Sequence, residues 1–237
     1  MGQSEHSSAV QILKHALETA WSPFAWAASA PSSALRRYRA SLADNGQAAA
    51  CARFDNRKWT LDLLKHLEWR RFEELCAAYY EALGFRTRLL HERADGAVEI
   101  VLCAEPDRAS VIVHAKAWDA YRIGIGPLRE LRDAMAIASV RKGVLVTSGR
   151  FTREAVNFAA QEHIQLIDGA GLLEKLSELN PEKSLALLQF TMQGDFLTPT
   201  CPACSAKMIS RRSIQGGRPY WGCVNYPRCK HTFSSTA

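Results

Sequence analysis

The sequence predicts an α/β fold with a mixed β-sheet flanked by helices. Three observations support this fold class. Apolar residues between positions 61 and 83 recur every three or four residues, which is the spacing of a helix. Several later segments are short, rich in Val and Ile, and have the length of strands. From position 86 to 179 the expected elements follow the order βββαβαβα, and such alternation of strands with helices is typical of α/β proteins.

The helix over positions 61–83 is the first element expected in this region. Gly84 ends it, because the left-handed position after a helix favours glycine. A short strand over 86–90 follows. The preceding residues, 1–57, are rich in Ala and Ser and are interrupted by prolines, so we expect an N-terminal extension of one or two helices.

The remaining elements are short runs separated by turn residues. The expected strands are 97–103, 111–116, 143–147 and 164–167, and the expected helices are 128–139, 152–163 and 170–179. A turn sequence at 105–108 makes the strands beside it an antiparallel hairpin if it closes. The expected divisions of the chain are an extension at 1–57, the α/β domain at 58–180, a connecting helix and linker at 181–198, and a cysteine-rich module at 199–237.

Composition and charge narrow the class of protein. The 237 residues are 47% hydrophobic and 23% charged, which fits one folded core with a small additional module and not a disordered chain. The net charge of +6 fits a nucleic-acid partner, although this signal alone is weak. No basic segment followed by an apolar one opens the sequence, and the longest apolar stretch is too short and interrupted to span a bilayer. We therefore expect a soluble, cytoplasmic protein with no membrane partner.

Four cysteines near the C-terminus have the spacing of a metal site. Cys201, Cys204, Cys223 and Cys229 form a C-x2-C-x18-C-x5-C pattern. Zn²⁺ takes four thiolates at tetrahedral corners, and the metal replaces a core that so few residues cannot build. The pattern predicts a structural Zn²⁺ site, with an iron–sulfur cluster or unpaired thiols as alternatives. The other cysteines, among them Cys76, lie in apolar surroundings and are expected to be buried thiols.

The same module is basic and aromatic. Residues 201–237 contain no Asp or Glu. Basic side chains neutralise phosphates, and aromatic rings such as that of Tyr226 can stack on unpaired bases. The candidate DNA contacts are Lys207, Arg211, Arg212, Arg218, Tyr220, Trp221, Arg228 and Lys230. Alternatively, the aromatic residues only pack the module, which then binds protein or nothing.

A second group of polar residues lies on two expected neighbouring strands. Glu99 is on one strand, and His114 and Lys116 share a face of the other because they are two residues apart. A carboxylate, a second ligand and a lysine at one sheet edge can hold a divalent metal and a water. The spacing alone is weak, because a Glu…His-x-Lys pattern is common by chance.

The cysteine module resembles the zinc ribbon at the C-termini of type IA DNA topoisomerases. The similarity rests on the run CPACSAKMISRR, the aromatic-Trp-Gly-Cys run GRPYWGC, and the ending NYPRCKHT. In that family the ribbon contacts DNA, largely single strands, and the resemblance implies the same activity here.

The central region resembles the Mrr-like restriction endonuclease domain of the PD-(D/E)xK nuclease superfamily. The similarity runs from about position 59 to 179 through WRRFEELCAAYYEALGF, RADGAVEI, VIVHAKAW, VLVTSGRFTREAVNFA and IQLIDGAGLL. Several members of that family also carry the topoisomerase-type ribbon. The resemblance implies a restriction-endonuclease-like sheet over 58–180 and a DNA nuclease that uses Mg²⁺ or Mn²⁺.

The resemblance also assigns catalytic positions. The family's catalytic acid falls on Glu99, and the Gln and Lys of its QxK motif fall on His114 and Lys116. A helix glutamate falls on Glu73, and the aspartate that precedes the catalytic acid falls on Asp95. Two residues depart from the family pattern, because Glu replaces Asp at 99 and His replaces Gln at 114. The changes retune the metal preference or mark a decayed site.

Two hypotheses follow. The first is a metal-dependent endodeoxyribonuclease that acts in restriction or in DNA defence and processing. The second is a catalytically inactive DNA-binding protein with a degenerate site. Cutting both strands of a duplex would favour a homodimer. The sequence does not indicate which DNA sequence, structure or modification is recognised.

Overall fold

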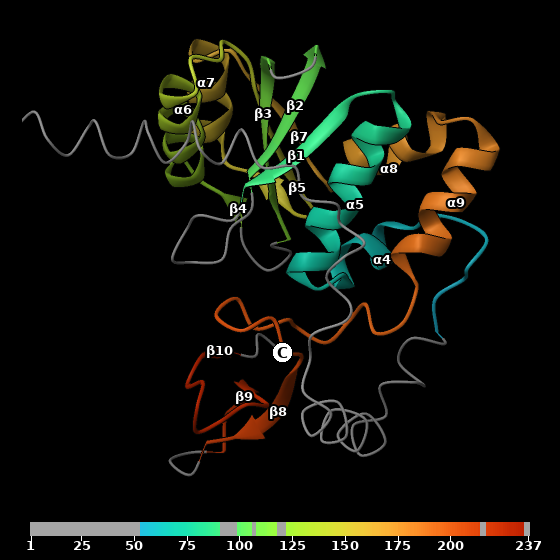
Figure 1. Cartoon of the computed structure of the whole chain (residues 1–237), viewed down its shortest axis with the longest axis vertical. Coiled ribbons are helices and arrows are strands. Elements are labelled where there is room, and N and C mark those ends of the chain that lie inside the picture. Colours follow the sequence, from blue (N-terminus) through green and yellow to red (C-terminus); the bar gives the residue numbers. More distant parts are fainter. Residues whose placement is uncertain (1–52, 91–98, 106–107, 118–121, 214–216, 235–237) are drawn as a thin grey trace, which may run out of the picture.

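A five-stranded mixed sheet forms the centre of the larger folded unit (Figure 1). The structure, a computed structural model, describes residues 53–90, 99–105, 108–117, 122–213 and 217–234. The strands of this sheet, in spatial order, are β1 (Arg86–Leu90), β2 (Glu99–Glu105), β3 (Arg108–Lys116), β5 (Gly143–Thr147) and β7 (Ile164–Ile167). β1, β2 and β3 pair in antiparallel fashion, whereas β3, β5 and β7 are parallel. The predicted mixed α/β sheet is therefore confirmed.

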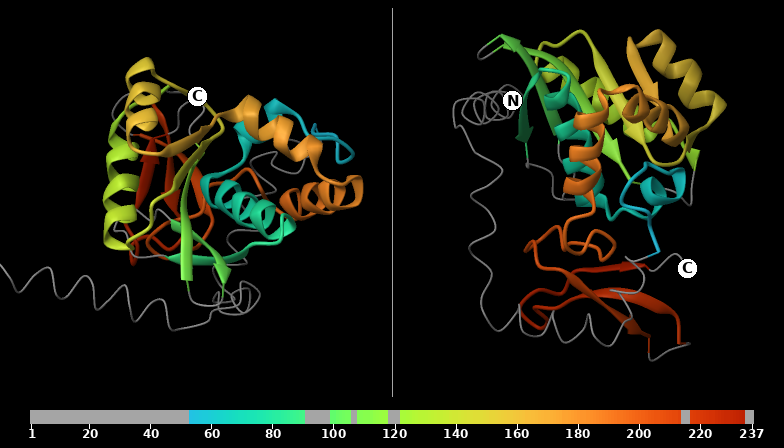
Figure 2. Two further views of the ribbon diagram at one scale, coloured as in Figure 1. Left: turned by 90° about the horizontal axis from the view of Figure 1, so that it is seen from above. Right: turned by 90° about the vertical axis from the view of Figure 1, so that its right-hand side faces the viewer.

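Helices cover both faces of the sheet and give two apolar clusters. The helices are α4 (Leu61–His66), α5 (Trp69–Ala82), α6 (Gly126–Ile137), α7 (Arg153–Gln161), α8 (Gly169–Glu178) and α9 (Pro181–Thr191). α4, α5, α8 and α9 contribute to the cluster on one face, and α6 and α7 to the cluster on the other. Figure 2 shows α6 and α7 separated from the other helices by the sheet. None of the described helices is long and apolar enough to cross a membrane.

The helix predicted over 61–83 is two helices. Thr60 caps α4 by accepting a hydrogen bond from the Leu63 backbone N–H (3.1 Å). The chain then turns out of the helical conformation at Leu67, and the Glu68 carboxylate caps α5 by accepting from the Arg70 N–H (3.1 Å). The apolar spacing hides this break, because leucines of α4 and aromatic residues of α5 enter the same cluster. Gly84 has a φ of +95°, as the sequence predicted.

Two short strands were not expected from the sequence. β4 (Arg122–Ile123) and β6 (Arg150–Phe151) pair in parallel outside the main sheet. Each has two residues, which is too short for a pattern of alternating apolar residues to reveal it.

The second folded unit is the ribbon, which we define as residues 199–237. Its antiparallel sheet has the order β10 (Thr232–Ser234), β9 (Pro219–Cys223) and β8 (Met208–Arg212). A small cluster of Cys201, Met208 and Cys223 forms its interior. Figure 2 shows the ribbon at one end of the larger unit, next to the starts of α4 and α5.

The region predicted as a connecting helix and linker, 181–198, packs against the larger unit. It begins with α9, which lies beside α5 (Figures 1 and 2). Phe196 is buried in the main cluster, and its ring lies edge-on to Phe54 with 6.0 Å between centroids. This segment therefore joins the core and is not a loose connection. Of the N-terminal extension predicted at 1–57, residues 1–52 lie outside the described residues.

Candidate active site and metal centre

Glu99 and His114 meet across neighbouring strands. They are directly paired in the β2–β3 register, and Oε1 of Glu99 lies 3.2 Å from Nε2 of His114. Only 3% of the His114 side chain and 17% of the Glu99 side chain are exposed. Because side chains alternate along a strand, His114 shares a face with Ile112, on the side covered by α6 and α7. The two family-implied ligand positions thus converge at one place on the sheet.

The ring nitrogens of His114 distinguish this pair from an ordinary buried polar contact. Neither nitrogen has a hydrogen bond with good geometry to a described residue, even though Nε2 is close to Glu99. Burying such groups is costly without a partner. Two donors at neighbouring positions of an octahedral ion, with bonds of about 2.1 Å, lie about 3 Å apart. The observed separation fits the family-implied divalent metal, with Glu99 and His114 as two of its ligands.

Lys116 lies two residues beyond His114 on the same face of β3. It pairs with Thr147 at the end of the parallel strand β5. Thr147 is fully buried, and its hydroxyl accepts a hydrogen bond from the Gly149 N–H (3.1 Å). The lysine is therefore placed beside the Glu99–His114 pair by two strands whose positions are fixed by the sheet.

The two remaining predicted site residues are less closely placed. Glu73 is a buried residue of α5, a helix that packs against β3. Within the part of the chain that the structure describes, it does not form a cluster with Glu99 and His114 in which all donor atoms lie within 4.8 Å. Asp95 lies outside the described residues. The structure thus brings together Glu99 and His114, and it places Lys116 two residues further along the same face of β3.

The four predicted zinc ligands form one cluster. The sulfur atoms of Cys201, Cys204, Cys223 and Cys229 all lie within 4.8 Å of one another. The Cys201–Cys229 and Cys204–Cys223 sulfur pairs are 3.6 and 3.3 Å apart. With Zn–S bonds of about 2.3 Å, tetrahedral thiolates are about 3.8 Å apart, so the cluster fits a zinc ion after a small expansion.

The environment of these thiols differs from one to the next. Burial raises the pKa of Cys201 to about 11 and raises the pKa of Cys223 as well. Burial also acts on Cys204, but hydrogen bonds from the Ala206 backbone and from Cys223 outweigh it, and its pKa falls to about 7. The Asn225 side chain donates to the Cys204 sulfur (3.5 Å), which contributes to the lower pKa of this thiol.

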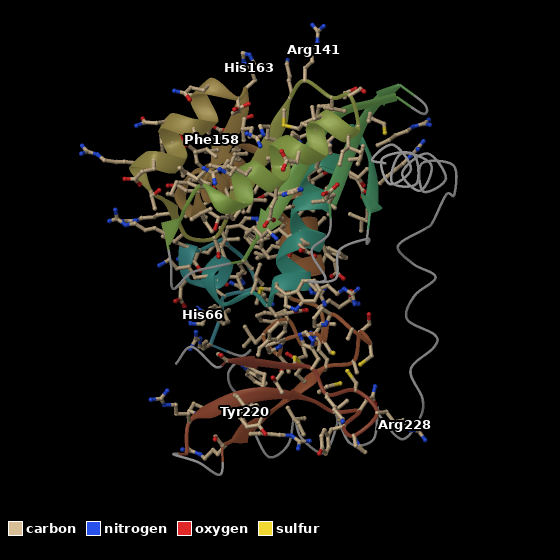
Figure 3. The ribbon with its side chains drawn as sticks, turned by 90° about the vertical axis from the view of Figure 1, so that its left-hand side faces the viewer. His66, Arg141, Phe158, His163, Tyr220 and Arg228 are labelled. Carbon is tan, nitrogen blue, oxygen red and sulfur yellow. The ribbon has the colours of Figure 1, made fainter. Side chains whose placement is uncertain are left out.

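The candidate DNA contacts of the ribbon lie on different faces. Tyr220 and Trp221 are consecutive in β9, so their side chains point to opposite sides of the sheet. Trp221 packs against the cysteine cluster with Met208. Figure 3 shows Tyr220 and Arg228 on the ribbon, with Arg228 at its outer edge. Arg212, Arg218, Arg228 and Lys230 are exposed.

Arg211 lies across the ribbon sheet. Its guanidinium carbon is 5.6 Å from the centre of the Tyr226 ring. Gly222 makes room for it, because a Cβ there would meet the Arg211 side chain at 3.0 Å. Tyr226, whose ring the sequence indicates can stack on unpaired bases, is 58% exposed. Exposure of a large aromatic residue is not visible in the pattern, because Tyr226 lies between cysteines in a loop.

Lys207 has partners within the protein. Its amine donates to Oε1 of Glu68 (3.0 Å) and to the Thr198 carbonyl (2.8 Å). Glu68 was not singled out by the sequence, because its partners in the ribbon are 132 and 139 residues away along the chain.

Two family models match consecutive parts of the chain. Residues 64–176 match a model described as a restriction endonuclease, and residues 198–236 match a model described as a topoisomerase DNA binding C4 zinc finger. A DNA topoisomerase 1 of Pyrococcus horikoshii is 28% identical over 97 residues, which is 39% of this chain and 13% of that protein.

Two solved structures are similar at low identity. The DNA modification-dependent restriction endonuclease AspBHI has a TM-score of 0.41 and 18% identity, over 55% of this chain and 38% of that one. The MspJI restriction endonuclease in complex with a 27-mer oligonucleotide has a TM-score of 0.32 and 18% identity. This match covers 56% of this chain and 34% of that one. The chain thus spans well under half the length of the proteins it matches.

The two family matches confirm both resemblances predicted from the sequence. The chain contains a restriction-endonuclease domain followed by a topoisomerase-type C4 zinc ribbon.

Proposed function

We propose that this protein is a divalent-metal-dependent endodeoxyribonuclease whose C-terminal ribbon binds Zn²⁺ and DNA. The observation that carries the proposal is the contact between Glu99 and His114, with Lys116 on the same face of β3. The His114 imidazole is buried, faces the Glu99 carboxylate and makes no hydrogen bond to a described residue. Together these two groups offer a nitrogen and an oxygen donor to a metal ion.

In this proposal each residue has a distinct chemical role. Glu99 and His114 would hold Mg²⁺ or Mn²⁺. Asp95 is a further candidate acidic ligand, whereas Glu73 lies on α5, which packs on the opposite face of the sheet from His114. A divalent ion held there would supply Lewis-acid chemistry, polarising a phosphate oxygen and lowering the pKa of a water. Hydrolysis would join a water oxygen to phosphorus and break the bond from phosphorus to one sugar oxygen, which would take up a proton. Lys116 stabilises the negative charge that develops on the phosphate during this step.

A second function is supported by the same contact. At 3.2 Å, a protonated His114 and an ionised Glu99 also satisfy each other's charge. The nuclease domain would then be a scaffold, and the protein would bind DNA without cutting it. The two functions differ in whether the pair contacts a divalent ion, which a cleavage assay tests directly.

The ribbon supplies the proposed DNA surface. We assign its stacking position to the ring of Tyr226, because this ring is exposed and lies next to the Arg211 guanidinium. Arg212, Arg218, Arg228 and Lys230 add positive charge for phosphates. Trp221 is assigned to the interior of the ribbon, since it packs on the cysteine cluster.

The test is incubation of the purified full chain with plasmid DNA, modified and unmodified, in Mg²⁺ or Mn²⁺. Nicked or linear products that disappear with chelator are the expected result. Binding without cleavage under all of these conditions would support the inactive alternative. Sedimentation of the protein with and without DNA then reports whether a homodimer forms.

A further inference from the structure

A buried carboxylate joins the ribbon to the nuclease domain. Glu68 is 7% exposed and lies between α4 and α5. Its Oε1 accepts hydrogen bonds from the Thr200 hydroxyl (2.9 Å) and the Lys207 amine (3.0 Å). Its Oε2 accepts from the Thr200 backbone N–H (3.2 Å) and from the Arg70 N–H in the first turn of α5 (3.1 Å). One side chain therefore caps a helix of the nuclease domain and binds two residues of the ribbon.

Neighbouring residues strengthen the same junction. The Trp69 indole donates to the Thr200 carbonyl (2.7 Å), and the Glu68 N–H donates to the Phe196 carbonyl (3.0 Å). The Arg71 guanidinium donates to the Phe190 and Gln193 carbonyls (both 3.1 Å). The start of α5 is thus bonded to three carbonyls in the segment that leads into the ribbon and to one carbonyl in the ribbon itself.

The two ribbon partners of Glu68 are positioned by the zinc ligands. Thr200 directly precedes Cys201 and forms a bridge with Lys207, and the Cys201 N–H donates to the Ala206 carbonyl (2.8 Å). Met208, which follows Lys207, is fully buried in the cysteine cluster. The loop that the first two cysteines close therefore presents both donors to Glu68.

The negative charge of Glu68 is compensated by groups of both the ribbon and the nuclease domain. A buried carboxylate is unfavourable unless hydrogen bonds and an opposite charge compensate for its lost hydration. Three of the four donors that Glu68 uses come from the ribbon. If the ribbon unfolded, Glu68 would keep only the Arg70 N–H from this set, and the start of α5 would lose its fixed cap.

We propose that Glu68 couples metal binding in the ribbon to the nuclease domain. The zinc-folded ribbon holds Glu68, and Glu68 positions the N-terminal turn of α5, the helix that carries Glu73. The inference rests on the zinc part of the proposed function and is independent of catalysis. Glu68 is a positioning residue, and the ribbon acts as a fixed part of the nuclease fold.

Hydrogen exchange of the full chain, with and without a strong zinc chelator, tests this coupling. Zinc content is measured first, so that a ribbon without metal is recognised as a failure of the proposed zinc site. In the wild type, chelation should increase exchange in residues 69–75 and lower the Tm of the nuclease domain by roughly 5–15 °C. In Glu68→Gln, exchange in this turn should already be high with zinc bound, and chelation should add little.

Two further variants keep the test decisive if Glu68→Gln folds poorly. Lys207→Met should reproduce the increased exchange at the start of α5, and its effect should not add to that of Glu68→Gln. The matched controls are Glu174→Gln and Lys142→Met, exposed residues of the same types outside the junction, which should behave as wild type. Zinc loss that leaves exchange in α5 unchanged, or additive effects at Glu68 and Lys207, would overturn the proposal.

Discussion

At the scale of single residues, His114 decides how the candidate site works. Its imidazole is buried against Glu99, and its ring nitrogens make no hydrogen bond of good geometry to a described residue. Imidazole binds Mn²⁺ more willingly than Mg²⁺, which prefers oxygen ligands and strict octahedral geometry. One of the two residues that depart from the family pattern thus also underlies the expected metal preference.

Replacement of Lys116 by alanine tests the proposed catalytic charge. We expect Lys116→Ala to reduce kcat by about 10²-fold or more, because its charge acts where negative charge develops in the transition state. DNA affinity should change little, since this interaction is weaker in the ground state. Cleavage rates and binding isotherms of the same preparations check both parts, with Lys175→Ala on α8 as a control. Equal losses in binding and cleavage would contradict the assignment.

The double variant Glu99→Asp with His114→Gln tests the metal ligands. It restores the residues that the resembling family carries. We expect cleavage to shift from Mn²⁺ toward Mg²⁺, because an amide oxygen replaces an imidazole nitrogen. Titration of activity against each ion measures the shift. If the wild type is inactive and the double variant cuts DNA, the fold is intact and only the substituted metal ligands prevent activity. An unchanged metal preference would argue against ligation by His114.

The contact between Glu99 and His114 could be predicted only in part from the sequence. Strand alternation places His114 and Lys116 on one face, and the resemblance implies the partner Glu99. The register that pairs positions 99 and 114 depends on the β2–β3 hairpin, which contains an irregularity near Cys103. The role of Glu68 could not be predicted from the sequence, because it depends on contacts between parts of the chain that are distant in sequence.

At the scale of elements, the strands β1, β5 and β7 have the bounds that the sequence predicted. β5 and β7 are short runs rich in Val, Leu and Ile, and they are followed by the turn residues Ser148-Gly149 and Asp168-Gly169. The break between α4 and α5 was missed, because Leu67 and Phe72 enter the same apolar cluster and continue the helical spacing across it. The faces of the ribbon were also only partly predicted. Tyr220 and Trp221 were both predicted to contact DNA, but they are consecutive in β9, and side chains alternate along a strand. They therefore point to opposite sides of the sheet.

Two aromatic substitutions in the ribbon distinguish a DNA-stacking role from a packing role. Tyr226→Ala should weaken binding of single-stranded DNA by about 1–3 kcal/mol, the usual contribution of one stacked base, and should leave the salt dependence unchanged. Trp221→Ala should instead lower zinc retention and ribbon stability, because Trp221 packs against the cysteine cluster. Fluorescence titrations at several salt concentrations and metal analysis distinguish the two. Loss of stacking from Trp221→Ala with zinc fully retained would reverse the assignment.

At the scale of the whole molecule, the ribbon and the nuclease domain are joined by buried contacts and not by a loose linker. Phe196 enters the main core, and Glu68 binds Thr200 and Lys207. Removal of residues 199–237 would therefore have two consequences. It would remove the basic surface, and it would leave Glu68 without three of its donors. Weaker DNA binding by a truncated protein would not by itself locate the DNA surface, because the nuclease domain would also be destabilised.

Charge-neutralising variants distinguish loss of the basic surface from loss of the contacts at Glu68. Arg218→Gln and Arg228→Gln change exposed residues of the ribbon and leave the junction at Glu68 intact. If both side chains contact phosphates, the slope of log K against log salt should fall by about 0.7–0.9 for each, because each contact releases condensed counterions. Binding isotherms over a range of salt concentrations measure the slope, and unchanged zinc content and Tm confirm that the fold is intact. The truncated protein should show a larger loss of slope, because it also lacks Arg212 and Lys230, together with a lower Tm. A slope that stays unchanged in the double variant would place the DNA surface on the nuclease domain, and the ribbon would then act mainly through its contact with α5.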